Sequence, residues 1–426
     1  MQSLHDLPSY YQASAHNAPE CQTLKTSISV DVCVIGAGIT GLVSALTLCE
    51  KGYRVAVVEA YEIGHGASGR SGGQAIFGWA VEQNKLEKMV GSEDAHLFWQ
   101  IAAEGLSKTK QRIADYGIDC DWQDGMVHLA TKSAQDRVLQ HEYHQLVDRY
   151  GYTSLEFWDI DQVREQIAST RYTCGLYDSN SGHLHPLNYT LGLAAAAINA
   201  GATIYTHSPV IQLRSGPVNR VKTLQGEIDA AHVIIAGNGY LHGVSEQLNK
   251  YIMPVGTFIG ATEPLTKERS ESLIKQQIAA CDINLALDYY RFSRDHRLLF
   301  GGRVSYSRRV PGDLKESMRL KMLKVFPQLR DVVMEYAWGG WLGITMNRAP
   351  HFGRLYPSVY FAQGFSGHGI VVGAMAGELM AEAVATSAER FDVFSKIHHR
   401  PFPGGRMFRT PALVLAMAYY RIRDAL

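Results

Sequence analysis

The segment from residue 30 to residue 60, VDVCVIGAGITGLVSALTLCEKGYRVAVVEA, constrains the fold more than any other part of the sequence. Apolar residues alternate through its first six positions, as in a buried strand. From Leu42 they recur at i, i+3, i+4 and i+7, the spacing of a helix with one buried face. RVAVVE then predicts a second strand. This order of strand, helix and strand predicts a Rossmann-like α/β fold.

The turn between the first strand and the helix carries glycines in G-x-G-x-x-G spacing. Gly36 permits the tight turn, Gly38 lets a pyrophosphate approach the backbone, and Gly41 lets the helix pack on the strand. Free N–H groups at the helix start attract phosphate, and Glu59 accepts hydrogen bonds from ribose hydroxyls. The acid disfavours a 2′-phosphate, which leaves NAD or FAD. The predicted contacts are Gly36, Gly38, Ile39, Thr40, Gly41, Glu59 and Ala60.

The run GHGASGRSGGQ, residues 64–74, favours FAD over NAD. A nicotinamide dehydrogenase normally continues in alternating strands and helices, whereas an extended FAD needs backbone contacts beyond its adenosine half. A disordered linker would have polar flanks, but this run is followed by the apolar and aromatic AIFGWA. We therefore predict a second glycine-rich cradle for FAD. Its predicted contacts are Gly66, Ala67, Ser68, Arg70, Ser71, Gly72, Gly73 and Gln74.

The two glycine motifs together resemble the FAD-dependent amino-acid and amine oxidase superfamily, which includes D-amino-acid, glycine and sarcosine oxidases. Later segments that also resemble it are SGHLHPLNYTLGLAAAAINAGATIYT, HVIIAGNGY, WLGITMNRAPHFG and YFAQGFSGHGIVVGAMAGELMAEAV. Other segments are similar to gamma-glutamylpolyamine oxidases: SYYQASA, LDYYRFSRDHRLLFGGR, FSGHG and PFPGGR. The narrower resemblance implies a gamma-glutamylated amine as substrate, with gamma-glutamylputrescine as the type.

The resemblance also implies a discontinuous FAD-binding domain and a second α+β substrate domain whose sheet covers the flavin. We assign residues 1–90, 156–245 and 338–395 to the first domain and residues 91–155 and 246–337 to the second. Residues 396–426 are expected to form a C-terminal extension that packs on the body.

The sequence GNGYLHG, residues 237–243, is a candidate second nucleotide motif. No clear amphipathic helix or terminal acid follows it, so we interpret it as another loop against FAD. Val210 and Gly237 are predicted FAD contacts in this part of the chain. Without a second dinucleotide site, the electrons are expected to come from the substrate.

A third glycine-rich run, GFSGHG, precedes an apolar helix-like segment. Its backbone N–H groups and the positive end of that helix would stabilise negative charge on the flavin, although an ordinary helix-capping loop would look the same. The predicted flavin contacts are Gly364, Ser366, Gly367, His368, Gly369 and Ile370.

Amine oxidation requires a neutral amine, because an ammonium has no lone pair to expel the hydride; a desolvated pocket or a nearby base meets this need. The candidate catalytic residues are His185, His368, Tyr290, Arg348 and Trp341. His183 is the alternate to His185, and one of the two could cap the helix that starts at Pro186. Strand alternation puts only one of Tyr289 and Tyr290 toward the substrate, and we choose Tyr290. Candidates for a carboxylate partner at the channel mouth are Arg303, Arg308 and Arg309.

Composition narrows the function classes. The 41 basic and 41 acidic residues give a formal net charge of +0, which argues against nucleic-acid partners. No run of 18 apolar residues occurs, and Glu378 and Glu382 interrupt the best candidate, so no integral membrane segment and a cytoplasmic location are expected. None of the six cysteines follows Cys281, so the covalent flavin linkage of some superfamily members is not available and FAD is expected to be non-covalent. No supporting cluster of ligands suggests a metal.

Two other functions compete with gamma-glutamyl amine oxidation. One is a D-amino-acid or glycine-type enzyme, in which an arginine would hold the substrate carboxylate over the flavin. The other is a flavin domain of a tRNA-modifying enzyme, which the neutral net charge disfavours. O2 is the expected electron acceptor, and transfer of the electrons to another acceptor is the alternative.

Overall fold

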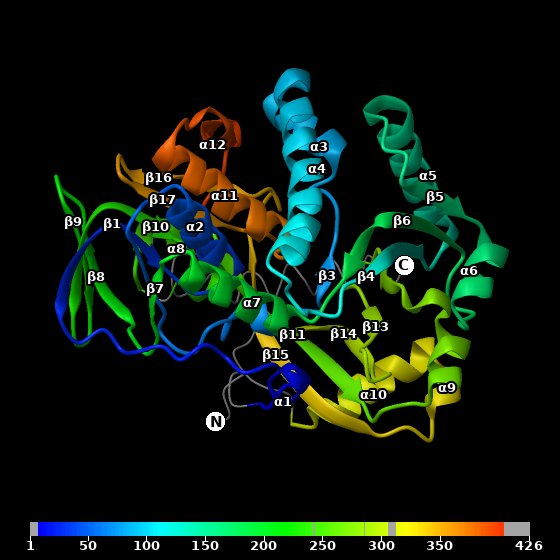
Figure 1. Ribbon diagram of the computed structural model, residues 1–426. Helices are drawn as coiled ribbons and strands as arrows, with labels where there is room; N and C mark the ends of the chain where they lie inside the picture. The colour runs from blue at the N-terminus through cyan, green and yellow to red at the C-terminus, as the bar shows by residue number, and fades with distance from the viewer. Residues whose placement is uncertain (1–6, 242, 285, 306–311, 404–426) are drawn as a thin grey trace.

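Two β-sheets form the framework of the chain in the computed structural model (Figure 1), which describes residues 7–241, 243–284, 286–305 and 312–403. The first sheet has parallel strands at its centre, and its strands in spatial order are β16 (His351–Tyr356), β17 (Val359–Gln363), β10 (Glu227–Ile235), β1 (Ser27–Ile35), β2 (Val55–Val58) and β7 (Thr203–Tyr205). A small antiparallel extension on β10 is formed by β9 (Asn219–Thr223) and β8 (Val210–Arg214).

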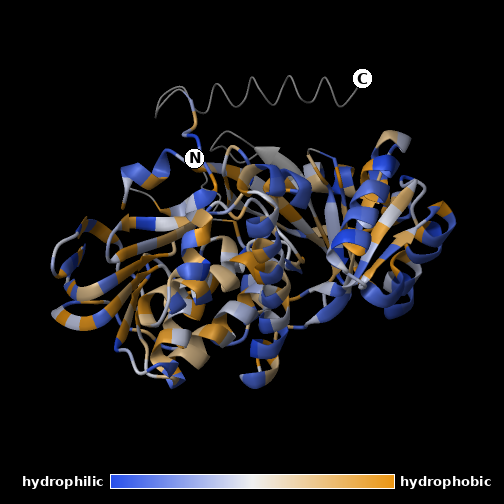
Figure 2. Ribbon diagram, turned by 90° about the horizontal axis from the view of Figure 1, so that it is seen from above, coloured by the Kyte–Doolittle hydropathy of each residue, from blue (hydrophilic) through white to orange (hydrophobic). Residues whose placement is uncertain are grey.

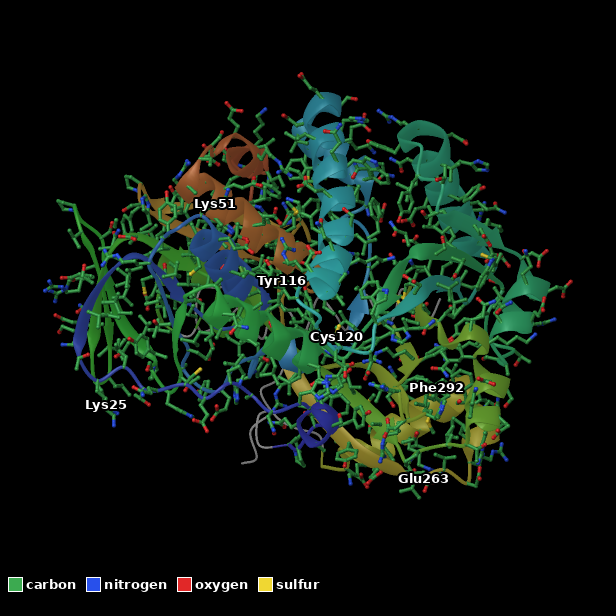
Figure 3. All side chains as sticks on the ribbon, in the orientation of Figure 1. Lys25, Lys51, Tyr116, Cys120, Glu263 and Phe292 are labelled. Atoms are coloured by element: carbon green, nitrogen blue, oxygen red, sulfur yellow. The ribbon has the colours of Figure 1, made fainter. Side chains whose placement is uncertain are left out.

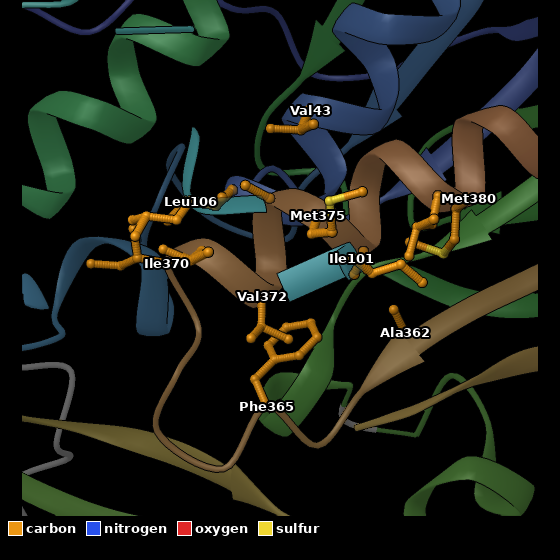
Figure 4. Close-up of a cluster of buried hydrophobic side chains, with 14 of the residues drawn as sticks. Val43, Ile101, Leu106, Ala362, Phe365, Ile370, Val372, Met375 and Met380 are labelled. Atoms are coloured by element: carbon orange, nitrogen blue, oxygen red, sulfur yellow. The ribbon is translucent and has the colours of Figure 1, made fainter. Parts of the chain in front are cut away.

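Helices cover one face of this sheet. They are α2 (Ile39–Glu50), α7 (Pro186–Asn199), α11 (Val371–Ala385) and the long α4 (Ser92–Asp115). Figure 4 shows side chains of α11, such as Met375 and Val372, in a buried apolar cluster with Val43 of α2 and with Ile101 and Leu106 of α4. This packing holds α2 against α11.

An ion-pair cluster joins α11 to α4. Glu378 is only 7% exposed and pairs with Lys108 and Arg112. The charge of Glu378, which interrupts the apolar sequence of α11, is therefore paired inside the protein. No helix in the described ranges is both long and apolar enough to cross a membrane.

The second sheet is mostly antiparallel. Its strands in spatial order are β15 (Met334–Ile344), β11 (Met253–Thr262), β14 (Leu298–Ser305), β13 (Tyr289–Phe292), β12 (Ala279–Asp282), β4 (Gln123–Ala130), β6 (Cys174–His183) and β3 (Gln74–Ala75), with β5 (Leu155–Trp158) on β6. Its outer face packs on α10 (Leu314–Val325) through an apolar core that includes Phe258, Tyr290 and Met318.

The other α-helices of the described residues are α1 (Tyr10–Ser14), α3 (Gln83–Val90), α5 (Ser133–His144), α6 (Ile160–Gln166), α8 (Glu246–Asn249), α9 (Lys267–Leu273) and α12 (Glu389–Asp392). Figure 2 shows apolar residues on the strands of both sheets and polar residues along outer helices. The apolar side chains of both sheets pack in buried cores.

The predicted α/β class with two sheets is confirmed. Sheet membership divides the chain differently from the proposed domain boundaries. β5, β6 and β15 belong to the second sheet, although most of their residues lie in segments assigned to the FAD domain. Only the first residues of β5 and β15 lie in segments 91–155 and 246–337. Of the C-terminal extension, residues 404–426 lie outside the described residues, and the backbone N–H of Phe402 donates to the Lys250 carbonyl at 2.9 Å.

Candidate active site

A cavity of about 880 Å³ lies at the carboxyl ends of β1, β2 and β10, and strands β4, β11, β12 and β13 of the second sheet contribute to its opposite wall. Open α/β sheets bind ligands at this edge because the loops after parallel strands meet there. The volume is at the upper end of ordinary small-molecule pockets, as an extended dinucleotide requires.

The G-x-G-x-x-G turn, Gly36 to Gly41, forms one end of the cavity. Gly38 caps α2 without a side-chain hydrogen bond, and a Cβ built on it would lie 2.7 Å from Ser68 Oγ. Ser68 Oγ accepts a hydrogen bond from the Ile39 N–H at 3.1 Å. A Cβ on Gly41 would overlap the Gly36 carbonyl, so glycine here is what permits close helix–strand packing. Gly38, Ile39 and Thr40 thus place the start of α2 at the cavity wall.

Glu59 lies beside this turn at the end of β2. Its carboxylate accepts hydrogen bonds from the N–H groups of Ala37 at 2.8 Å and Tyr61 at 3.1 Å. Burial raises the pKa of this carboxyl, and the backbone donors oppose the rise. A carboxylate has about four acceptor positions, so it retains capacity for ribose hydroxyls.

The second cradle follows the short 3₁₀ turn at Ala67–Gly69. Ser71 Oγ is buried and has no hydrogen-bond partner among the described residues, which is costly unless a ligand supplies one. A Cβ on Gly72 would lie 2.6 Å from the Tyr289 ring, and Gly73 has φ +79°. An orphaned hydroxyl and backbone without room for side chains fit an extended FAD.

Most of the predicted cofactor contacts line the cavity: Gly36, Gly38, Ile39, Thr40, Glu59, Ala60, Gly66, Ala67, Ser68, Ser71, Gly72, Gly73, Gln74, Val210, Gly237, Ser366, Gly367, His368, Gly369 and Ile370. Gly41, Arg70 and Gly364 do not. Gly41 acts in packing. The Arg70 guanidinium donates to the carbonyls of His65 at 3.3 Å and Gly339 at 3.2 Å, which ties the cradle to β15. Gly364 has φ +78° and donates its N–H to Asn238 Oδ1 at 2.9 Å.

The loop before α11 brings His368 to the cavity wall. His368 Nδ1 lies 3.1 Å from the Gly78 carbonyl oxygen. Because a carbonyl only accepts, this contact assigns the proton to Nδ1 and leaves Nε2 as an acceptor. Burial lowers the pKa of His368 to about 4, so the ring is neutral at neutral pH.

His185 does not line the cavity. It caps α7, where its Nδ1 accepts a hydrogen bond from the Asn188 N–H at 3.1 Å, and its Nε2 lies 3.1 Å from Ser14 Oγ. His183 also lies outside the large cavity, with its Nε2 2.8 Å from the Gln277 carbonyl. Sequence analysis predicted either a catalytic or a helix-capping role for this histidine pair, and His185 has the capping role.

Strand alternation turns Tyr289, and not Tyr290, to the cavity. Tyr290 is fully buried on the outer face of the sheet, where its ring stacks on Phe300. Trp341 lines the cavity, as does the exposed Arg348. Arg348 has φ +60°, and its guanidinium lies 3.5 Å from the Ser366 carbonyl. Arg308 and Arg309 lie outside the described residues, and of Arg303 only the backbone in β14 is described.

The sequence prediction missed His128. His128 lies on β4 and pairs with Cys281 on β12, which in turn pairs with Tyr289 on β13. All three residues line the cavity. Burial lowers the pKa of His128 to about 4. The alternation in QDGMVHLA was a usable signal, because Val127 and Leu129 pack in the outer core and leave His128 on the opposite face.

The family assignment follows from comparison with known proteins. A profile of the DAO family, described as FAD dependent oxidoreductase, matches residues 31–383. The chain belongs to this family. It is 42% identical to the gamma-glutamylputrescine oxidoreductase of Escherichia coli over 98% of each chain, and 40% identical to the probable oxidoreductase OrdL of Haemophilus influenzae over 98% and 97% of the two chains.

Solved structures agree with this assignment at the level of the fold. The glycine oxidase from Geobacillus kaustophilus matches with a TM-score of 0.73 at 21% identity, covering 87% of this chain and 99% of that one. The protein is therefore an FAD-dependent oxidoreductase that binds its cofactor non-covalently, and its homologues include amine and amino-acid oxidases.

Proposed function

We propose that this flavoenzyme oxidises the terminal amine of a gamma-glutamylated amine, with gamma-glutamylputrescine as the type substrate, in polyamine catabolism. The amine, O2 and water give the aldehyde, ammonia and hydrogen peroxide. The observation that carries the proposal is the 42% identity to a gamma-glutamylputrescine oxidoreductase along 98% of both chains. Such similarity covers the substrate-side sheet as well as the dinucleotide fold.

The cavity wall is suited to an uncharged amine. Apolar and aromatic side chains there, such as Leu287, Tyr289 and Trp341, favour a desolvated ligand, and desolvation lowers the pKa of an amine. His128 and His368 are neutral imidazoles at neutral pH and can accept hydrogen bonds from an amine N–H. When bound, FAD supplies the acceptor for the hydride on the carbon next to nitrogen.

Arg348 suits the opposite, zwitterionic end of such a substrate. It is exposed at the cavity wall, and a guanidinium binds a carboxylate in two parallel hydrogen bonds. We expect Arg348→Ala to raise KM for gamma-glutamylputrescine at least tenfold and to leave the slow reduction of the flavin by putrescine, which lacks the carboxylate, nearly unchanged. An equal change for both amines would remove Arg348 from this role.

The test of the function is anaerobic reduction of the holoenzyme, followed by air. Gamma-glutamylputrescine, putrescine, glycine and D-alanine are compared by bleaching of the flavin absorbance. We expect rapid bleaching only with the gamma-glutamyl amine, and stoichiometric hydrogen peroxide after air is admitted. Bleaching by glycine or D-alanine alone would establish the amino-acid oxidase alternative, and slow reoxidation in air would assign another electron acceptor.

A further inference from the structure

A buried arginine lies directly behind the second glycine cradle. Arg291 on β13 is only 3% exposed. Its Nε donates to the Gly72 carbonyl at 2.7 Å, and its Nη2 donates to the Leu184 carbonyl at 2.8 Å and to Tyr11 Oη at 3.2 Å. Its Nη1 donates to the Phe292 carbonyl at 3.2 Å. One guanidinium thus joins α1, the cradle, the start of α7 and the second sheet.

The Arg291 guanidinium lies close against the backbone of Gly72 and Gly73. A Cβ built on Gly73 would lie 2.6 Å from Arg291 Nη2, so only glycine admits the guanidinium at this position. Gly72 and Gly73 line the large cavity, whereas Arg291 does not. The guanidinium therefore contacts the cradle backbone from outside the cavity.

The charge of Arg291 has no acidic counterpart among the described residues. Asp119 and Asp121, which line a smaller cavity of about 370 Å³ that Arg291 also borders, form ion pairs with Arg294 instead. Figure 3 labels Cys120 and Phe292, two further residues of this smaller cavity, in the interior near the lower end of α4 and the second sheet.

The titratable groups that face Arg291 are neutral at neutral pH. His183 Nδ1 lies 3.5 Å from Arg291 Nη1, and burial together with the positive charge lowers the pKa of both His183 and His185 to about 3. Burial raises the pKa of Tyr11 above its ordinary value. A buried cation without a counter-charge is costly, although its hydrogen bonds reduce that cost.

We propose that Arg291 is a positioning residue of the cofactor site, which holds the Gly72–Gly73 backbone in place and supplies a fixed positive charge that raises the reduction potential of bound FAD. Reduction adds negative charge to the flavin, and a cation in a low-dielectric interior stabilises the more negative state. This inference concerns FAD and is independent of which amine is oxidised.

Two substitutions separate the two roles. Arg291→Lys keeps the charge but cannot make hydrogen bonds in a planar fork, and Arg291→Gln removes the charge. The midpoint potential is measured by dye-coupled reduction with FAD in excess, and the FAD Kd by quenching of flavin fluorescence. Arg294→Gln is the control, because Arg294 lies three residues away with a side chain that is 71% exposed.

We expect both variants at Arg291 to bind FAD about tenfold or more weakly, because several hydrogen bonds to the cradle region are lost. Only Arg291→Gln should also have a lower midpoint potential, and the control should match the wild type in both measurements. Equal potentials in all four proteins would overturn the electrostatic role. If Arg291→Gln does not fold, Arg291→Lys decides the positioning role: an unchanged FAD Kd would overturn it.

Discussion

The ring of Tyr289 occupies the space above Gly301 on the neighbouring strand. The two residues pair across β13 and β14, and a Cβ built on Gly301 would overlap the ring. The same ring borders Gly72 in the second cradle. A glycine in the second sheet thus determines where an aromatic side chain meets the cofactor site.

Gly301→Ala should displace the Tyr289 ring. We expect a loss of about 1–3 kcal/mol in the free energy of unfolding, because the inserted methyl group meets a well-packed ring, and a higher KM for the amine. Urea unfolding and steady-state kinetics measure the two effects. Gly312→Ala is the matched control, since a Cβ there meets no atom of the described residues within 4 Å; equal behaviour of the two variants would contradict the packing argument.

Substitution of the adjacent tyrosines should separate the site from the core. Tyr289→Ala is expected to raise KM about tenfold or more with a modest loss of stability, since its ring lines the cavity. Tyr290→Ala removes a fully buried ring and should cost about 3–5 kcal/mol of stability while the folded fraction keeps its KM. A KM effect confined to Tyr290→Ala would reverse the assignment of the two faces.

Ser71→Ala should have opposite effects on the empty protein and on the cofactor complex. The Ser71 hydroxyl is buried without a hydrogen-bond partner among the described residues, so its removal should leave the apoprotein as stable or more stable. FAD binding should weaken about fivefold to tenfold, because one hydrogen bond is lost. Thermal unfolding of the apoprotein and FAD titration give the two values. Unchanged FAD affinity would show that the hydroxyl does not contact the cofactor.

Acid should destabilise the protein through its buried histidines. The pKa of His128 is lowered to about 4 by burial, against about 6.5 in an unfolded chain. Between these values the unfolded chain binds one more proton at this residue, so stability is complete above pH 6.5 and falls as pH decreases toward 4. The slope is about 1.4 kcal/mol per pH unit for each such proton.

His128→Asn should therefore reduce the pH dependence of unfolding below pH 6.5. Urea unfolding at pH 7.5, 6.0 and 5.0 measures this slope for the variant and the wild type. The exposed His141 provides the control substitution, His141→Asn. The same slope in His128→Asn and wild type would show that His128 is not held neutral in the folded protein.

Local motifs were predictable from the sequence, and long-range partners were not. The turn around Gly36, Gly38 and Glu59 could be predicted because the strand, glycines, helix and acid follow one another within a short stretch. The choice between Tyr289 and Tyr290 failed because alternation separates two faces without saying which one meets the cavity. His185 was overvalued because a histidine before a helix start is also an N-cap, and His128 was missed because its pairing with Cys281 spans distant segments.

The hydrogen bond between Tyr11 and Arg291 spans 280 positions of the chain. During synthesis the dinucleotide turn and the second cradle leave the ribosome early, but the guanidinium that supports Gly72 is made only after about two thirds of the protein. A nascent chain that ends before β13 thus lacks this support. The second cradle therefore gains this support only after β13 has been synthesised and joined to α1.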